Sequence, residues 1–294
     1  MTEATMTEAT THTLEVPGAV LTYDVREKES TAKPPLLLIG LPMGAAGYGS
    51  LVGYVTDRMV ITYDPRGSER SRRTDNSTKP SLEEHADDLH RLITELGIRP
   101  VDLFGSSGGA VSGLALVAHH PEDVRTLVAH EPPIADVLPD RKEALDAVMD
   151  IYQTYQRSGF GPAMGKFIGI VSYKGPIPAD FADQPQPDPA MFGMPTEDDG
   201  SRDDVMFEQT LRQIAQYQLD FDALRAASTR IVIAAGEESE GILASRAAYV
   251  IAERLGTEVV LFPGDHGGFM GGEYGQPPGK PAEFAAKLSQ LLDA

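Results

Sequence analysis

Residues 100–118, PVDLFGSSGGAVSGLALVA, constrain the fold of this chain more than any other stretch. The apolar run at 101–104 predicts a short strand, and the small and apolar residues that follow predict a helix. Between them, Gly105, Ser107 and Gly109 fit the pattern G-x-S-x-G. So sharp a turn strains the backbone at the serine and presents its hydroxyl at the tip of a sheet, above a helix N-terminus. An ordinary glycine-rich turn is the alternative, but the flanking strand and helix favour Ser107 as a nucleophile.

Predicted strands and helices alternate along most of the chain. Before this motif, residues 14–16 and 19–25 predict a hairpin, and the apolar runs at 36–39 and 60–63 predict buried strands. Ser81 predicts the start of a helix, because Glu84 completes a capping box with it. After the motif, strands are predicted at 124–129, 230–235 and 258–262, and a last helix from Pro281. Such alternation is typical of an α/β fold with a mostly parallel, doubly wound sheet.

The alternation is interrupted between residues 134 and 227, which predict helices and loops. This block follows the sixth predicted strand, so we expect a helical cap, or lid, over the strand ends. The α/β core then consists of residues 14–133 and 228–294. Residues 1–13, which open with MTEAT twice, are expected to form a disordered tail.

The charge of the chain limits its partners. Acidic residues number 44 against 25 basic ones, and the net charge of −19 argues against binding to nucleic acid or to an anionic membrane. The chain has no cysteines, which excludes disulfides and thiolate metal sites. No apolar run reaches the length of a membrane span, and no signal segment opens the sequence. We therefore expect a soluble cytoplasmic protein that binds a small-molecule substrate, with a homodimer left open.

His266 is the candidate general base. A serine hydroxyl is a poor nucleophile at neutral pH and needs a base within hydrogen-bond reach. His266 follows the last predicted strand, on a glycine-rich loop that can approach Ser107. His85 and His90 have no ligand partners at metal spacing, and we expect no metal; we also expect no cofactor. Four histidines are expected to be structural: His85, His90, His119 and His120.

Together, these features resemble the α/β-hydrolase family across residues 14–294. The resemblance rests on the G-x-S-x-G motif, the Asp-Pro-Arg-Gly turn at 64–67, the turn after Leu38, and His266 after the last strand. It implies that Ser107 is the nucleophile and His266 the base, in the chain order serine, acid, histidine.

The resemblance also implies an oxyanion hole made of backbone N–H groups. The family often has His-Gly at the first contributing turn, where this chain has Ile39-Gly40. The expected donors are the N–H groups of Leu41 and Gly108. Met43 is the alternative to Leu41, because Pro42 has no N–H.

The acid of the triad has several candidates. Most of the family places it after the strand that follows the cap, where this chain has Ser239 among Glu237, Glu238 and Glu240. Some members, such as the zearalenone-lactone hydrolases, place it at the end of the strand before the cap, in a His-Glu-x-Pro turn. Residues 130–133 are His-Glu-Pro-Pro, and Glu131 lies 24 residues after the serine. We expect Glu131 to be the acid, held in an extended conformation by the proline after it, with Glu238 and Glu240 as rivals.

The expected function is that of a serine-type hydrolase. Its substrate is a carboxylic ester or lactone with a small, largely apolar body, and its intermediate is an acyl-enzyme. A carbon–carbon bond hydrolase and a cofactor-free perhydrolase or haloperoxidase use the same triad and are alternatives. A ligand-binding protein with an inert triad is a further alternative. Epoxide hydrolases and dehalogenases of this family carry aspartate as the nucleophile and are therefore disfavoured.

Overall fold

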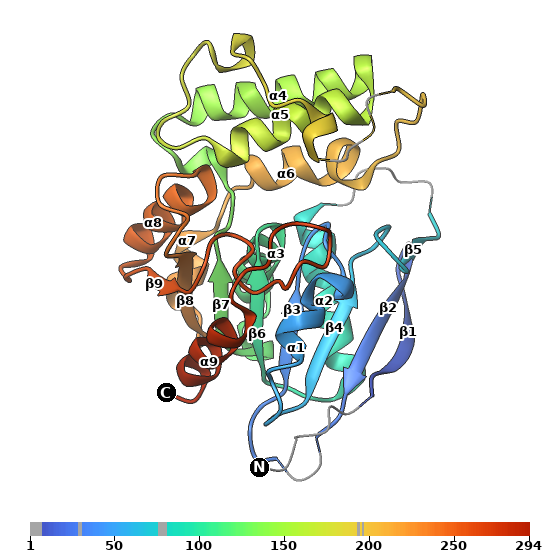
Figure 1. The fold of residues 1–294 in the computed structure, drawn as a ribbon. Helices are drawn as coiled ribbons and strands as arrows, with labels where there is room; N and C mark the ends of the chain where they lie inside the picture. Colours follow the sequence, from blue (N-terminus) through green and yellow to red (C-terminus); the bar gives the residue numbers. More distant parts are fainter. Residues whose placement is uncertain (1–7, 29–30, 76–80, 193–194, 196) are drawn as a thin grey trace.

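The computed structural model of the chain describes residues 8–28, 31–75, 81–192, 195 and 197–294. These residues form a nine-stranded sheet with helices on both faces and a helical cap above it (Figure 1). The strands are β1 (Thr10–Val16), β2 (Ala19–Arg26), β3 (Leu36–Ile39), β4 (Val60–Asp64), β5 (Arg72–Arg73), β6 (Val101–Ser106), β7 (Val124–His130), β8 (Arg230–Gly236) and β9 (Val260–Phe262). The helices are α1 (Gly49–Val52), α2 (Leu82–Leu96), α3 (Gly108–His119), α4 (Arg141–Ser158), α5 (Phe160–Ser172), α6 (Leu211–Ala215), α7 (Phe221–Ala226), α8 (Leu243–Leu255) and α9 (Pro281–Leu292).

The sheet has the order β1-β2-β4-β3-β6-β7-β8-β9, and β5 pairs with β2. Neighbouring strands from β4 to β9 are parallel, whereas the pairs that involve β1, β2 or β5 are antiparallel. The predicted mostly parallel α/β sheet is therefore confirmed. The two-residue strand β5 was not predicted, and the helical cap consequently follows the seventh strand rather than the sixth.

The first strand is longer than predicted. β1 pairs with β2 along its whole length, from Thr10 opposite Val25 to Val16 opposite Ala19. Residues 10–13, which we expected in a disordered tail, therefore form part of the sheet edge. Threonine favours strands, and an exposed edge strand needs no apolar side chains there. Residues 1–7 of the predicted tail lie outside the described residues.

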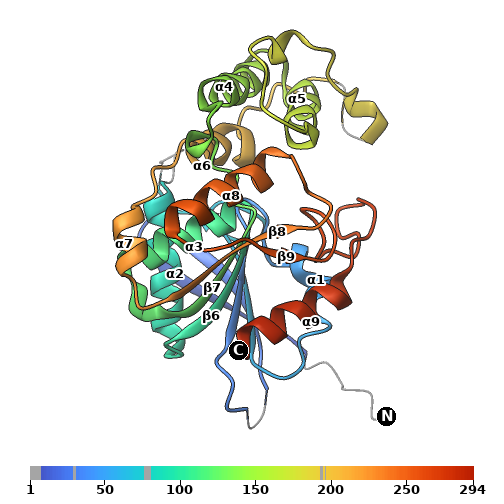
Figure 2. The same cartoon turned by 90° about the vertical axis from the view of Figure 1, so that its left-hand side faces the viewer.

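Helices cover both faces of the sheet. In Figure 2, α2, α3 and α7 lie on one side and α1 and α9 on the other. The first face buries side chains of α2, α3, α7 and α8 in one apolar cluster, and the second buries those of α1 and α9 in another. In the second cluster, the ring centroid of Phe284 lies 5.4 Å from that of Phe104 and 4.6 Å from that of Phe262. No helix in the described part of the chain is long and apolar enough to cross a membrane.

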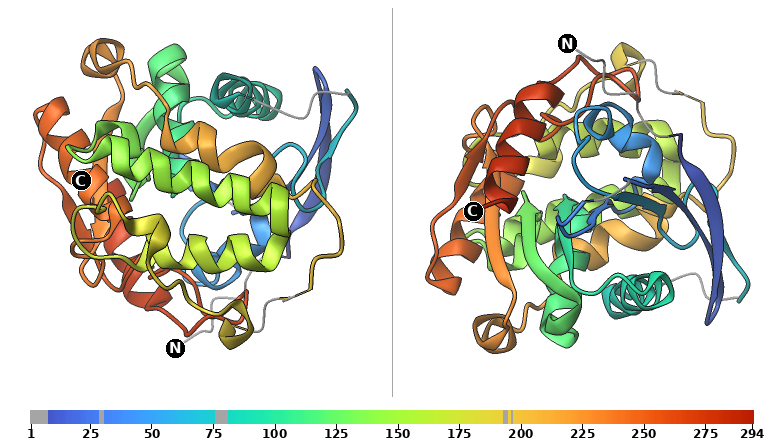
Figure 3. Two further views of the ribbon diagram at one scale, coloured as in Figure 1. Left: turned by 90° about the horizontal axis from the view of Figure 1, so that it is seen from above. Right: turned by 90° about the horizontal axis from the view of Figure 1, so that it is seen from below.

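The cap lies above the carboxyl ends of the parallel strands (Figures 1 and 3). Its helices α4 and α5 pack against each other, and Phe207 fills the space between them and the π-helix Val205–Thr210. Phe207 is fully buried, with its ring centroid 5.3 Å from that of Tyr155 and 5.5 Å from that of Phe160. The cap therefore has a small apolar core of its own.

Helix α5 was not predicted, because its sequence contains three glycines and a proline. Packing explains two of these glycines. An ideal Cβ on Gly165 would lie 2.6 Å from the carbonyl oxygen of Pro187, and one on Gly169 would lie 2.1 Å from Oε1 of Gln186. The segment around Pro187 thus lies directly against the helix backbone, which outweighs the low helix propensity of glycine.

The predicted start of α2 is observed. The Ser81 side chain accepts a hydrogen bond from the Glu84 N–H at 3.2 Å, and the Glu84 carboxylate accepts one from the Ser81 N–H at 2.8 Å. Gly97 ends the helix in a left-handed conformation with φ of 63°. Both ends of α2 are therefore determined by residues visible in the sequence.

We predict that Ser81→Ala lowers the free energy of unfolding by about 1 kcal/mol, because the Glu84 N–H loses its acceptor. Ser81→Gly is the matched control and should cost only a few tenths of a kcal/mol. Urea denaturation measures both values. Equal stability of the alanine variant and the original protein would show that the capping box contributes nothing.

Candidate active site

The register of the parallel strands brings three loops together at one edge of the sheet. Ser106 lies opposite His130, and His130 lies opposite Ala234 on the next strand. Gly236 in turn lies opposite Phe262. Ser107, Glu131 and His266 follow β6, β7 and β9 respectively, so their loops leave the same edge of the sheet, with β8 between the last two.

Ser107 lies in the sharp turn that its motif predicts. Its φ of 56° and ψ of −126° are rare for a residue with a side chain. An ideal Cβ on Gly105 would lie 2.7 Å from the Gly109 carbonyl oxygen, and one on Gly109 would lie 2.2 Å from the Ile39 carbonyl oxygen. Only glycine therefore allows β6, α3 and the end of β3 to approach so closely.

Glu131 and His266 are hydrogen-bonded to each other. Nδ1 of His266 lies 2.6 Å from Oε2 of Glu131, and the N–H of Gly236 donates to Oε1 at 2.8 Å. The Glu131 side chain is completely buried, whereas the His266 side chain is 40% exposed. Because Nδ1 faces the carboxylate, Nε2 is the nitrogen left for a substrate or a nucleophile.

The two side chains shift each other's pKa in opposite directions. Burial alone raises the pKa of Glu131, but the hydrogen bond and positive charge of His266 outweigh it and lower the pKa to about 2. Burial likewise opposes protonation of His266, but the hydrogen bond and charge of Glu131 outweigh it and raise the pKa of the imidazole above 6.5. Glu131 is therefore ionised at neutral pH and stabilises the protonated form of His266.

The backbone at Glu131 differs from the sequence expectation. We expected Pro132 to hold Glu131 extended, but its φ is 50°, in the left-handed region. Its N–H still donates to the Ala234 carbonyl oxygen at 2.9 Å, so the chain turns away from the sheet immediately after the last paired residue. This tertiary constraint outweighs the local preference before proline.

The rival acids do not bind His266, although Glu238 lines the same cavity as His266 and Ser107. Glu238 binds Nζ of Lys280 at 2.6 Å, and its side chain is 55% exposed. Glu237 and Glu240 are also exposed. Ser239, at the usual position of the family's acid, is buried. Of the four glutamates considered, Glu131 is the one hydrogen-bonded to His266 in the described structure.

The two turns expected to supply oxyanion donors are in contact. An ideal Cβ on Gly108 would lie 2.4 Å from the Leu41 carbonyl oxygen. The Tyr48 hydroxyl donates to the Ile39 carbonyl oxygen at 2.5 Å and so holds the start of the first turn. Within the described residues, the N–H groups of Leu41, Met43 and Gly108 donate to no other group. All three remain available as donors.

A cavity of about 580 Å³ lies between the cap and the strand ends, and both Ser107 and His266 line it. Its walls are mostly apolar, and the sequence alone did not identify the cap residues among them. Those from α5, the π-helix and α6 include Phe167, Ile170, Met206, Leu211 and Ile214. Such a space suits a small apolar molecule.

His130 was not singled out from the sequence, yet it lies beneath this site. It is completely buried, and its ring centroid lies 5.4 Å from that of Phe284 and 6.1 Å from that of His266. Its Nδ1 lies 3.4 Å from the Ser106 hydroxyl. Burial lowers the pKa of His130 to about 4, so its imidazole is neutral at physiological pH. Its position directly before Glu131 was the one clue in the sequence.

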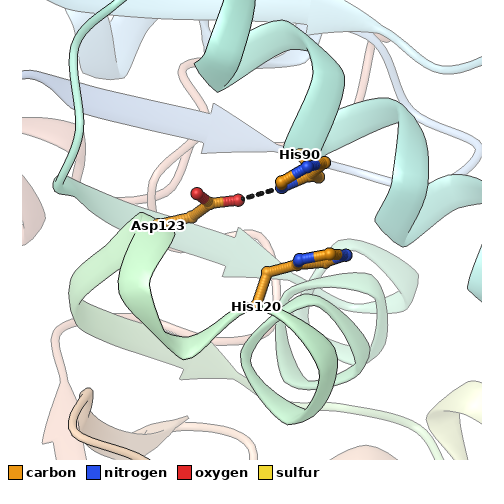
Figure 4. A group of neighbouring side chains, drawn as sticks. All are labelled: His90, His120 and Asp123. Carbon is orange, nitrogen blue, oxygen red and sulfur yellow. Dashed lines mark hydrogen bonds and ion pairs between the residues drawn. The ribbon is translucent and has the colours of Figure 1, made fainter.

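His90, His120 and Asp123 form a separate cluster near the amino ends of the strands (Figure 4). We expected His90 to have no ligand partners at metal spacing, but ligand atoms of His90, His120 and Asp123 lie within 4.8 Å of one another. Nδ1 of His90 lies 2.6 Å from Oδ2 of Asp123, and its ring stacks on that of His120 with a centroid distance of 3.8 Å and an interplanar angle of 19°. Zinc lies about 2.0–2.1 Å from a histidine nitrogen and in the plane of its ring. Two nearly parallel rings at this separation do not share an ion in that way, and Arg99 also pairs with Asp123 at 2.7 Å.

Comparisons with known proteins agree with this architecture. Residues 36–272 match the family model described as the alpha/beta hydrolase fold. The chain is 30% identical over 292 residues to "Uncharacterized hydrolase YraK" of Bacillus subtilis (strain 168). The alignment covers 96% of this chain and 95% of that protein.

Solved structures that share the fold include two hydrolases. A hydrolase from Pseudomonas aeruginosa PA01 has a TM-score of 0.64 at 18% identity, covering 97% of this chain and 98% of that one. MGS-M2, an alpha/beta hydrolase enzyme from a Medee basin deep-sea metagenome library, has a TM-score of 0.67 at 16% identity, covering 96% and 98%. At these identities the likeness concerns the fold alone.

We predict that Gly109→Ala lowers the free energy of unfolding by about 1–3 kcal/mol, because the added methyl group meets the backbone of β3. Gly113→Ala in the same helix is the matched control. There the ideal Cβ lies 2.9 Å from Cδ1 of Leu127, a side-chain end that can move. Urea denaturation compares the two variants, and equal losses of stability would contradict a specific requirement at Gly109.

Proposed function

The chain belongs to the α/β-hydrolase family, and on this basis we propose that it is a serine hydrolase of carboxylic esters or lactones. One observation carries the proposal: the buried Glu131 carboxylate binds His266 on the wall of the cavity that Ser107 also lines. A carboxylate–imidazole pair next to a strained serine is the arrangement that activates a serine hydroxyl.

In the proposed reaction, Nε2 of His266 takes the Ser107 proton while the serine oxygen attacks the substrate carbonyl carbon. The N–H groups of Leu41 and Gly108 donate to the oxyanion that forms. The His266 imidazolium then protonates the departing alcohol oxygen, which leaves an ester on Ser107. Water releases the acid by the same steps, with His266 again as the base. Glu131 stays ionised throughout and stabilises the imidazolium.

The proposed substrate is a small molecule with a largely apolar body. Small-ligand sites typically have volumes of about 300–1,000 Å³ and apolar walls with few polar groups. The cavity of about 580 Å³, with Phe167, Ile170 and Leu211 on its cap side, fits this description. Burying apolar substrate surface against the cap provides binding free energy, while the polar groups at the strand ends orient the carbonyl.

The pH dependence of the rate follows from the His266 pKa. Only neutral imidazole accepts the serine proton, and Glu131 raises the His266 pKa above 6.5, so activity should rise with pH through an apparent pKa above that value. In Glu131→Gln, the loss of the negative charge should lower the His266 pKa, so the rise in activity should occur at lower pH. We would measure kcat/KM for p-nitrophenyl butyrate from about pH 5 to about pH 9. A rate independent of pH across this range would exclude His266 as the base.

Covalent labelling tests the nucleophile. A fluorophosphonate probe should add its mass at Ser107, and Ser107→Ala should lose both labelling and turnover by several orders of magnitude. Ser106→Ala is the matched control and should retain substantial activity. Peptide mass spectrometry locates the label. A folded protein that is neither labelled nor active would instead be a ligand-binding member of the family, and loss of activity only in the Ser106 variant would place the nucleophile one residue earlier.

A further inference from the structure

Two residues that line the cavity have hydroxyl groups without a hydrogen-bond partner among the described residues. Thr210 and Ser239 are 2% and 1% exposed, and both side-chain oxygens are buried. Both residues line the same cavity as Ser107 and His266. Buried hydroxyls are nearly always hydrogen-bonded, because an unpaired one has lost its water without replacement. The chain thus leaves two polar groups without a partner on an otherwise mostly apolar wall.

Thr210 belongs to a segment of the cap that packs on the proposed oxyanion turn. It ends the π-helix Val205–Thr210 and lies one helical turn before Ile214 of α6. An ideal Cβ on Gly108 would lie 2.5 Å from Cδ1 of Ile214, so this segment packs directly on the start of α3. Short π-helical turns within helices frequently mark functional sites, and this one positions Thr210 over the site.

Ser239 approaches from the core, beside the proposed acid and base. It lies on the turn that follows Gly236, the last residue of β8, whose N–H donates to Glu131 at 2.8 Å. In the same turn, the Glu238 N–H donates at 3.0 Å to the carbonyl oxygen of Gly264, two residues before His266. The two residues with unpartnered hydroxyls therefore line the cavity of Ser107 and His266 from different parts of the fold, one from the cap and one from the core.

We propose that Thr210 and Ser239 bind oxygen atoms of the substrate, and that the preferred acyl group carries a hydroxyl or keto oxygen at C2 or C3. The inference rests on the proposed function. In this proposal each buried hydroxyl rotates about its Cα–Cβ bond to meet the substrate. A hydroxyl both donates and accepts, so it suits an alcohol or a ketone. A site with such groups discriminates against an analogue that lacks the oxygen, because the hydroxyls then stay unpaired.

The test compares kcat/KM, by pH-stat titration, for ethyl hexanoate and four oxygenated relatives. These are ethyl 2-hydroxyhexanoate, ethyl 3-hydroxyhexanoate, ethyl 3-oxohexanoate and ethyl 6-hydroxyhexanoate. The quantity compared is the kcat/KM of each oxygenated ester divided by that of ethyl hexanoate. For at least one ester oxygenated at C2 or C3, this ratio should be about 3- to 10-fold lower in Thr210→Val or Ser239→Ala than in the original protein, as expected for one lost hydrogen bond. The ratio for the 6-hydroxy ester should not change. The intrinsic reactivity of each ester cancels, because each is compared between variants.

Thr62→Val and Ser68→Ala are matched controls. They remove hydroxyls that are also buried and unpartnered within the described structure but do not line the cavity. Neither control variant should change the kcat/KM ratio of any oxygenated ester to ethyl hexanoate. Thr210→Val and Ser239→Ala should not lower the melting temperature, because the lost hydroxyls make no hydrogen bond in the folded protein.

Unchanged ratios in both cavity variants would overturn the inference, as would equal changes in the control variants. If the protein hydrolyses ethyl hexanoate through Ser107 and the ratios stay constant, only the inference fails. If it hydrolyses none of the five esters and Ser107 is not labelled, the proposed function fails and the inference fails with it.

Discussion

The buried carboxylate of Glu131 is the group on which the rest of the site depends. A carboxylate removed from water is strongly destabilising unless hydrogen bonds and an opposite charge replace its hydration. Gly236 and His266 supply these contacts at 2.8 and 2.6 Å, from the end of β8 and the loop after β9. The parallel register of β7, β8 and β9 must therefore hold for this carboxylate to be stable. The contact that satisfies the carboxylate also orients the imidazole toward the cavity.

The same edge of the sheet carries backbone strain. Ser107 and Glu131 have φ values of 56° and 50°, and such conformations cost about 1–3 kcal/mol each. Close packing at the glycines beside Ser107 holds the first turn in place. Under the second, the buried ring of His130 packs against Phe262 and Phe284. The apolar core thus fixes two polar groups in positions that local preference alone would not select.

Much of this architecture was predictable because it depends on local patterns. The turn at Ser107, the capping box at Ser81 and the alternation of strands and helices are all visible in short stretches of sequence. The pairing of Glu131 with His266 was expected from the family resemblance. Features set by distant contacts were not predictable. Helix α5 forms despite its glycines because the 186–189 segment packs on them, and the left-handed Glu131 follows from its pairing with β8. The unpartnered hydroxyls of Thr210 and Ser239 are visible only in the folded structure, in which the cap packs on the core.

The most direct test of this account is the kcat of Glu131→Gln beside that of Glu238→Gln, with circular dichroism to establish that both variants fold. The first change keeps the shape of the side chain but removes the charge that stabilises protonated His266. Loss of the equivalent carboxylate costs about 10⁴-fold in the serine-protease precedent, and a loss of that order is expected here. Glu238→Gln should stay within a few-fold of the original protein, because Glu238 lines the cavity but binds Lys280 rather than His266. A crippled Glu238 variant beside an active Glu131 variant would contradict the account.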